Sequence, residues 1–204
     1  MALILNLWVA PVLLLPLVAV SAWAFLMTKE FFVSAWLRAH PATYLVTHMA
    51  IMPLVDAYTT GLDWLASGAR PPHGLVLFLA VTFMNGVLIE IGRKIREPAA
   101  ERDGVDSYTK AWGLRVAPSV WLATLAGSAL LAAGAARHTG TAALAAPVLG
   151  ALALPRGVAA PSRFLRAPAE RSARLVDLAS QAWPAFTYLV LGALPFVVGA
   201  TGRR

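Results

Sequence analysis

A row of carboxylates that begins at Glu90 has the spacing to hold a metal ion. Glu90 and Glu97 stand at positions i and i+7, so on a helix they share one face. Mg²⁺ takes one or two carboxylates together with phosphate oxygens and water, which suits the clamping of a diphosphate. The candidate metal ligands are Glu90, Glu97, Glu101 and Asp103.

Basic side chains are interleaved with these carboxylates. Guanidinium and ammonium groups form strong hydrogen bonds with phosphate oxygens, so three residues are candidate diphosphate ligands: Arg93, Lys94 and Arg96. A salt-bridged helix end is an equally weighted interpretation, in which Glu90 pairs with Arg93 or Lys94 and so lowers the cost of its burial. The pattern leaves both open.

A second polar set lies in the apolar segment 43–66. His48 and Asp56 stand at i and i+8 on one helix face. An ionisable residue within a membrane faces a cavity or a partner by default, so Asp56 is a candidate catalytic residue. Asn85, in the next apolar segment, is another candidate, and a buried structural hydrogen bond is the alternative for each. His48 is more often a packing residue than a base.

The composition indicates the class of protein that carries these residues. Of 204 residues, 59% are hydrophobic and 13% are charged, whereas soluble domains carry about 25% charged residues. An all-α, polytopic membrane helix bundle is therefore expected, and a soluble enzyme domain or a disordered chain is excluded. The absence of cysteine from the sequence excludes disulfides, a thiolate nucleophile and a cysteine metal site.

Apolar runs that can cross about 30 Å of hydrocarbon as helices of roughly 20 residues recur along the chain. We predict one membrane domain over residues 1–204, with a short helix in the inner membrane interface within 161–180. Six spans are predicted, at 4–27, 43–66, 74–92, 116–135, 141–159 and 182–201.

The basic residues divide unevenly between the segments that join these spans. Of the 17 Lys and Arg residues, thirteen fall in one alternating set of segments and four in the other. Lys and Arg in short loops favour the cytoplasmic side, so the loop 93–115 is expected inside and both termini outside. The net charge of +7 then reflects topology. Membrane lipids are expected partners, and nucleic acid is not.

An ordered motif runs from Glu90 to Gly113. Glu90, Arg93 and Glu97 close an apolar span, and Gly104-Val105-Asp106-Ser107 and Trp112-Gly113 follow. The motif resembles the second aspartate-rich motif of the UbiA superfamily of intramembrane prenyltransferases, which includes the 4-hydroxybenzoate polyprenyltransferases. In that family Asp-x-x-Asp-x-x-x-Asp ends a span, and Glu90, Arg93 and Glu97 stand at the three carboxylate positions.

Two further features fit the same resemblance. Phe25-Leu-Met-Thr-Lys29 looks like the family's Tyr-x-x-x-Lys element, with Phe25 in place of the tyrosine. The sequence Glu-Ile-Gly-Arg-Lys-Ile-Arg from Glu90 resembles that of a bacterial subgroup, which implies the bacterial inner membrane. The likeness covers about residues 20–115 by motif and the rest by the spacing of the spans.

The resemblance implies a fold and a chemistry. Family members have nine helices in a U-shaped bundle, bind Mg²⁺ and a polyprenyl diphosphate at the cytoplasmic end, and transfer the prenyl group to an aromatic or other acceptor. Lys29 would then serve in catalysis and in diphosphate binding. This chain resembles the last six helices, so we expect the first three, with the first aspartate motif, to be missing or supplied by a partner chain. Arg93 at the middle carboxylate position weakens metal binding but can bind phosphate.

Two other kinds of function stay open. One is a non-catalytic membrane protein, either a truncated product or one part of a split enzyme. The other is a small transporter that uses Asp56 and His48 as a proton relay. A relay predicts charged residues deep in several spans, whereas the last three predicted spans have almost none.

Overall fold

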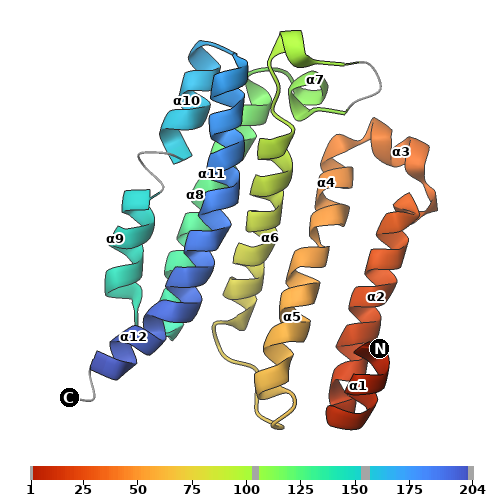
Figure 1. Cartoon of the computed structure of the whole chain (residues 1–204), viewed down its shortest axis with the longest axis vertical. Coiled ribbons are helices and arrows are strands. Elements are labelled where there is room, and N and C mark those ends of the chain that lie inside the picture. The colour runs from red at the N-terminus through yellow and green to blue at the C-terminus, as the bar shows by residue number, and fades with distance from the viewer. Residues whose placement is uncertain (1, 103–105, 153–156, 202–204) are drawn as a thin grey trace. The chain divides into compact units, whose positions relative to one another are not determined.

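A computed structural model describes residues 2–102, 106–152 and 157–201, and these fold into helices joined by short loops (Figure 1). The described residues contain no strand, which confirms the all-α class. Helices are expected in a chain this apolar, because hydrocarbon offers no hydrogen-bond partner and a helix pairs its backbone groups internally.

Long apolar helices dominate the described part of the chain. Within it, four helical segments have the length and composition to cross a membrane: Pro11–Thr28, Leu75–Arg93, Val116–His138 and Glu170–Val198. Their lengths of 18 to 29 residues span the thickness of a bilayer. The architecture is compatible with an integral membrane protein.

Two of the predicted spans contain none of these long helices. Segment 43–66 forms α4 (Pro41–Met49) and α5 (Ile51–Trp64), which are 9 and 14 residues long. Pro53 has no N–H to donate to the Met49 carbonyl, which explains the interruption between them. Segment 141–159 contains the 11-residue α9 (Ala142–Leu152), and residues 153–156, which follow it, lie outside the described part. The count of six spans stays a prediction.

The basic segment 161–180 is divided between two helices. The first is α10 (Ala159–Arg166), and the second is α11 (Glu170–Tyr188), which continues through a π-helical turn, Leu189–Ala193, into α12 (Leu194–Thr201). Pro168 separates α10 from α11, because a residue before proline disfavours the helical conformation. The helical segment that includes the predicted span 182–201 thus begins at Glu170.

The chain divides into two compact units, residues 1–83 and 84–204. The first contains α1 (Ala2–Val9), α2 (Leu14–Thr28), α3 (Ser34–Ala39), α4, α5 and the start of α6 (Leu75–Arg93). Within it α2 packs against α5. The side chain of Asn6 donates a 2.8 Å hydrogen bond to the hydroxyl of Tyr58.

The second unit contains the end of α6, then α7 (Tyr108–Trp112), α8 (Val116–His138) and α9 to α12. Trp121 of α8 is fully buried, and its Nε1 donates to the Leu88 carbonyl at 3.1 Å and to Ser180 Oγ at 2.8 Å. These bonds tie α6, α8 and α11 together. Small residues let membrane helices approach this closely, and Gly92 provides the space beside Ser180.

Candidate functional site

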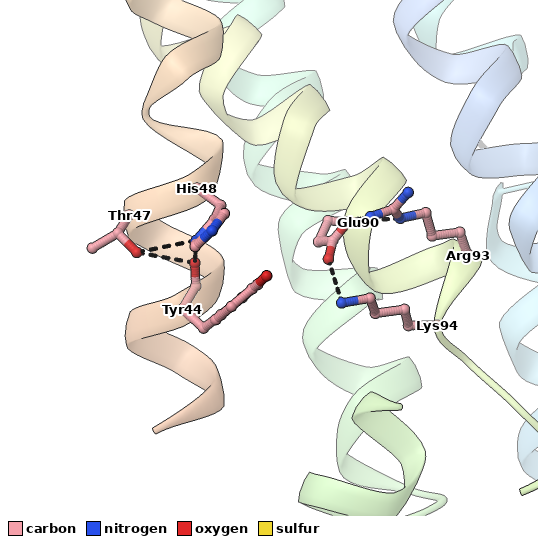
Figure 2. Close-up of polar contacts among 6 residues, drawn as sticks. All are labelled: Tyr44, Thr47, His48, Glu90, Arg93 and Lys94. Atoms are coloured by element: carbon pink, nitrogen blue, oxygen red, sulfur yellow. Dashed lines mark hydrogen bonds and ion pairs between the residues drawn. The ribbon is translucent and has the colours of Figure 1, made fainter. Parts of the chain in front are cut away.

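Glu90 lies in the last turn of α6, and both of its carboxylate oxygens are engaged by cations (Figure 2). Oε2 accepts from Arg93 Nε at 2.7 Å and lies 2.5 Å from Arg93 Nη2, while Lys94 Nζ lies 2.7 Å from Oε1. The Glu90 side chain is only 4% exposed. A buried carboxylate is costly unless it is paired, and these two cations supply the pairing. The salt-bridged helix end is therefore present.

The two cations differ in how freely they can reach another ligand. The Arg93 side chain is 58% exposed, so part of its guanidinium faces away from Glu90. Lys94 is 24% exposed and its Nζ lies 5.7 Å from the centre of the Tyr108 ring, a cation–π distance. Arg93 is consequently the more accessible cation for an anion arriving from outside.

Glu101 joins the ends of the loop that follows α6. Its Oε1 accepts hydrogen bonds from Ser107 Oγ at 2.5 Å and from Thr109 Oγ1 at 2.9 Å. Thr109 Oγ1 also accepts from the Arg96 backbone N–H at 3.0 Å. Ser107 in turn caps α7 by accepting from the Lys110 backbone N–H at 3.0 Å. The sequence does not indicate the roles of Ser107 and Thr109, because they depend on how the loop closes.

Two polar atoms of this loop are buried without a hydrogen-bond partner among the described residues, Arg96 Nε and Glu101 Oε2. A buried polar atom left unpaired costs about 1–3 kcal/mol. One atom is a donor and the other an acceptor, so Arg96 Nε is open to an anion and Glu101 Oε2 to a cation.

The structure corrects the expected helix face that Glu90 shares with Glu97. Helix α6 ends at Arg93, and Glu97 has an extended backbone, with φ −72° and ψ 156°. Pro98 explains this, because the residue before a proline avoids the helical region. The two carboxylates are therefore not presented at helical spacing. Asp103, the remaining candidate ligand, lies outside the described residues.

Asn85 is fully buried in a polar network that joins three helices. Its Nδ2 donates to Thr187 Oγ1 at 2.9 Å, and its Oδ1 accepts from Ser128 Oγ at 3.1 Å. Ser128 also accepts from Trp183 Nε1 at 2.9 Å. The amide thus has a protein partner on each side, which is the buried structural hydrogen bond that the sequence left open.

None of the residues above is assigned by likeness to another protein. No family model, curated protein or solved structure matches this chain. Among the described residues, no group of three or more His, Asp or Glu side chains is placed to hold a metal ion. The chemistry of the site is therefore read from its own residues.

Lys29 and Asp56 belong to the first unit, whereas the residues from Asn85 onward belong to the second. Lys29 is exposed at the end of α2, where its backbone N–H caps the helix by bonding the Phe25 and Leu26 carbonyls at 3.2 Å. Asp56 is half-buried on α5, and its backbone carbonyl accepts from Thr60 Oγ1 at 2.7 Å.

His48 lies in an aromatic cluster that the sequence analysis missed. Its ring stacks on Tyr44 with 3.9 Å between ring centres, and its Nδ1 lies 2.9 Å from the Tyr44 carbonyl (Figure 2). The Phe31 ring lies edge-on to the rings of His48 and Trp23, with 5.9 Å and 5.3 Å between the ring centres. The spacing of Tyr44 and His48 at i and i+4 was the available signal. Phe31 could not be foreseen, because it depends on a left-handed turn.

Proposed function

We propose that this chain is a UbiA-like membrane prenyltransferase that binds the diphosphate of a prenyl donor at the end of α6 and transfers the prenyl group to an acceptor. The observation that carries the proposal is the pair of cations, Arg93 and Lys94, fixed on the buried Glu90 at the end of a membrane-length helix. A donor with an apolar tail and a diphosphate head needs such a boundary between hydrocarbon and fixed positive charge.

The chemistry asks the protein to stabilise a leaving diphosphate while the allylic C–O bond breaks. Preorganised positive charge aimed at the leaving group is the usual means. Glu90 holds Nε of Arg93, so the exposed remainder of that guanidinium can donate to a phosphate oxygen without losing its orientation. In the proposal Arg96, in the loop after α6, adds to this charge. Lys29 and Asp56, which belong to the first unit, stay candidates by the resemblance and by their sequence pattern alone.

Mg²⁺ is part of the proposal as the resemblance implies it. Glu101 Oε2 fits a hard cation, since it is a carboxylate oxygen without a hydrogen-bond partner in the described part of the chain. Glu90 is a less suitable Mg²⁺ ligand than Glu101, because both of its carboxylate oxygens already bind cations. Glu97 and Asp103 remain proposed ligands with them. When bound, Mg²⁺ supplies positive charge to the leaving diphosphate.

The proposal includes a membrane topology. It has six spans in a UbiA-like partial bundle in the bacterial inner membrane, with the loop 93–115 cytoplasmic and both termini outside. The distribution of Lys and Arg between alternating segments supports this orientation. A partner chain that brings the first aspartate motif is also part of the proposal, because the resemblance implies two carboxylate motifs on one diphosphate.

Binding of farnesyl diphosphate to the purified chain in lipid nanodiscs tests the proposal. We expect saturable binding that weakens on removal of Mg²⁺. The Arg93→Gln variant should bind farnesyl diphosphate about ten- to a hundredfold more weakly, as expected for the loss of one charge-assisted contact. Arg137→Gln is the matched control, since Arg137 lies in the last turn of α8 and outside the site. Equal binding by both variants would refute the site.

The complete pairing of Glu90 favours a second candidate, a non-catalytic membrane protein in which the ion pairs only close the end of α6. Adding a membrane fraction of a partner that carries the first aspartate motif separates the two. Release of diphosphate from farnesyl diphosphate, dependent on Arg93, supports the enzyme. Binding without release, in the presence of that partner, supports the non-catalytic candidate.

A further inference from the structure

A cavity of about 420 Å³ lies in the second unit between α8, α10 and α11. Its volume falls within the range of small-molecule sites in proteins, about 300–1,000 Å³. Its walls are apolar, with Leu125 from α8 and Leu175, Leu178 and Phe186 from α11. Leu178 is 52% exposed and Phe186 is 37% exposed, so the cavity is a groove open along the side of the unit.

Close packing bounds this groove where α10 begins. A Cβ added at Gly157 would lie 2.6 Å from Leu125 Cδ2, so the backbone at Gly157 nearly touches α8. Further along α10, Ala160 and Phe164 are buried while Arg163 is exposed. The groove is therefore fixed by packed helices and does not depend on a loop.

One charged side chain lines the groove, Arg163 in the last turn of α10. Three more exposed arginines follow near the turn from α10 to α11, and with Arg163 they are called the basic corner: Arg163, Arg166, Arg171 and Arg174. In the described residues no carboxylate lies within 4.0 Å of any of these guanidinium groups. Glu170 and Asp177 stand on α11 within one helical turn of Arg174, so four arginines and two carboxylates leave the corner with a net charge of about +2.

We propose that the groove binds an anionic phospholipid, with one acyl chain along the apolar wall and the phosphate on Arg163. Charge complementarity selects this occupant. An apolar groove alone accepts any acyl chain, whereas the net positive basic corner at its end favours a headgroup with net negative charge over a zwitterionic one. Arg suits this contact because its planar guanidinium can bind a phosphate through two hydrogen bonds.

This inference is independent of the proposed prenyl transfer. It concerns α8, α10 and α11, whereas the proposed diphosphate site lies at the end of α6 and in the loop that follows. A lipid held here would cover the side chains of Leu178 and Phe186, which are exposed in the groove.

Native mass spectrometry of the full chain released from detergent tests the lipid site. The probes are dioleoyl phosphatidylglycerol and dioleoyl phosphatidylcholine, which share their acyl chains and differ in net charge. We expect roughly tenfold greater retention of phosphatidylglycerol. This preference should be lost in Arg163→Gln, reduced less in Arg163→Lys, and unchanged in Arg137→Gln. Equal retention of the two lipids, or retention unchanged in Arg163→Gln, overturns the proposal.

A second variant tests the acyl chain separately. Ala179→Phe places a ring in the groove and should reduce retention of both lipids by roughly tenfold, whereas Ala123→Phe on the exposed face of α8 should not. Circular dichroism confirms that each variant keeps its helices. Displacement of phosphatidylglycerol by farnesyl diphosphate in the unmodified chain would assign the groove to a prenyl donor and overturn the lipid proposal.

Discussion

Gly92 and Ser180 stand so close that a Cβ on Gly92 would lie 1.8 Å from Ser180 Oγ and 2.7 Å from Ser180 Cβ. The same Ser180 Oγ accepts from Trp121 Nε1 and donates to the Val176 carbonyl at 2.7 Å. The contact brings α6 and α11 together in the last turn of α6, which also carries Glu90. The position of Glu90 in the second unit therefore depends on a residue without a side chain.

Gly92→Ala should destabilise the chain. The added methyl group cannot fit without moving α6 or α11, and overpacking of this kind costs about 1–3 kcal/mol. The measurement is the midpoint of thermal unfolding in detergent, followed by tryptophan fluorescence. Gly127→Ala on α8 is the control, because a Cβ there meets no atom within 4 Å. A second substitution, Ser180→Gly, should recover part of the loss, and no recovery would argue against the contact as the cause.

Glu90→Gln should destabilise the second unit more than Arg93→Gln does. Removal of the carboxylate charge weakens two ion pairs at once, and a hydrogen bond to a charged group contributes about 1.5–3 kcal/mol, less for the largely exposed Arg93. In Arg93→Gln the carboxylate keeps Lys94 at 2.7 Å. Denaturant unfolding measures both variants, with Glu170→Gln at the exposed start of α11 as the control. The reverse order of the two losses would contradict the assigned pairing.

Asn85→Ala should lower stability by about 1–3 kcal/mol, because it leaves Ser128 and Thr187 without their shared partner in a buried site. Ser119→Ala is the control, since its exposed hydroxyl bonds only the Arg115 carbonyl of its own helix. Urea or SDS unfolding gives the comparison. Prenyl transfer lost at unchanged stability would instead favour a catalytic role for Asn85.

Cysteine labelling tests the proposed orientation, and a chain without native cysteine makes it direct. Asp106→Cys and Ser67→Cys both place a thiol at an exposed position. A membrane-impermeant maleimide should label residue 67 from the outer side of intact cells and residue 106 only after permeabilisation. Labelling of both from one side would contradict the topology.

The sequence could predict the class, the long apolar helices and the local pairing at Glu90. All three depend on short-range periodicity: runs of apolar residues, and cations at i+3 and i+4 from a carboxylate. The prediction failed at Glu97, since it extended the helical spacing across the restriction imposed by Pro98. The spacing of the charged residues was given more weight than the extended backbone that Pro98 favours for Glu97.

Other features could not be foreseen, because they join residues far apart in the chain. The hydrogen bonds of Glu101 to Ser107 and Thr109 require the loop to fold back on itself. The network of Asn85 with Thr187 requires knowing which face of α11 meets α6. A single sequence gives the polar residues that need partners but not the partners.

The corner between α2 and α3 affects where local unfolding of the first unit begins. Glu30, Phe31 and Phe32 have φ of 46°, 53° and 59°, a left-handed conformation that costs each non-glycine residue about 1–2 kcal/mol. This cost is offset where the Phe31 ring packs on Trp23 and His48. Phe31→Gly would relieve the backbone cost but lose the ring contacts. Because the corner keeps its costly backbone only through these contacts, amide hydrogen exchange should begin there, while α2 and α4 are still helical.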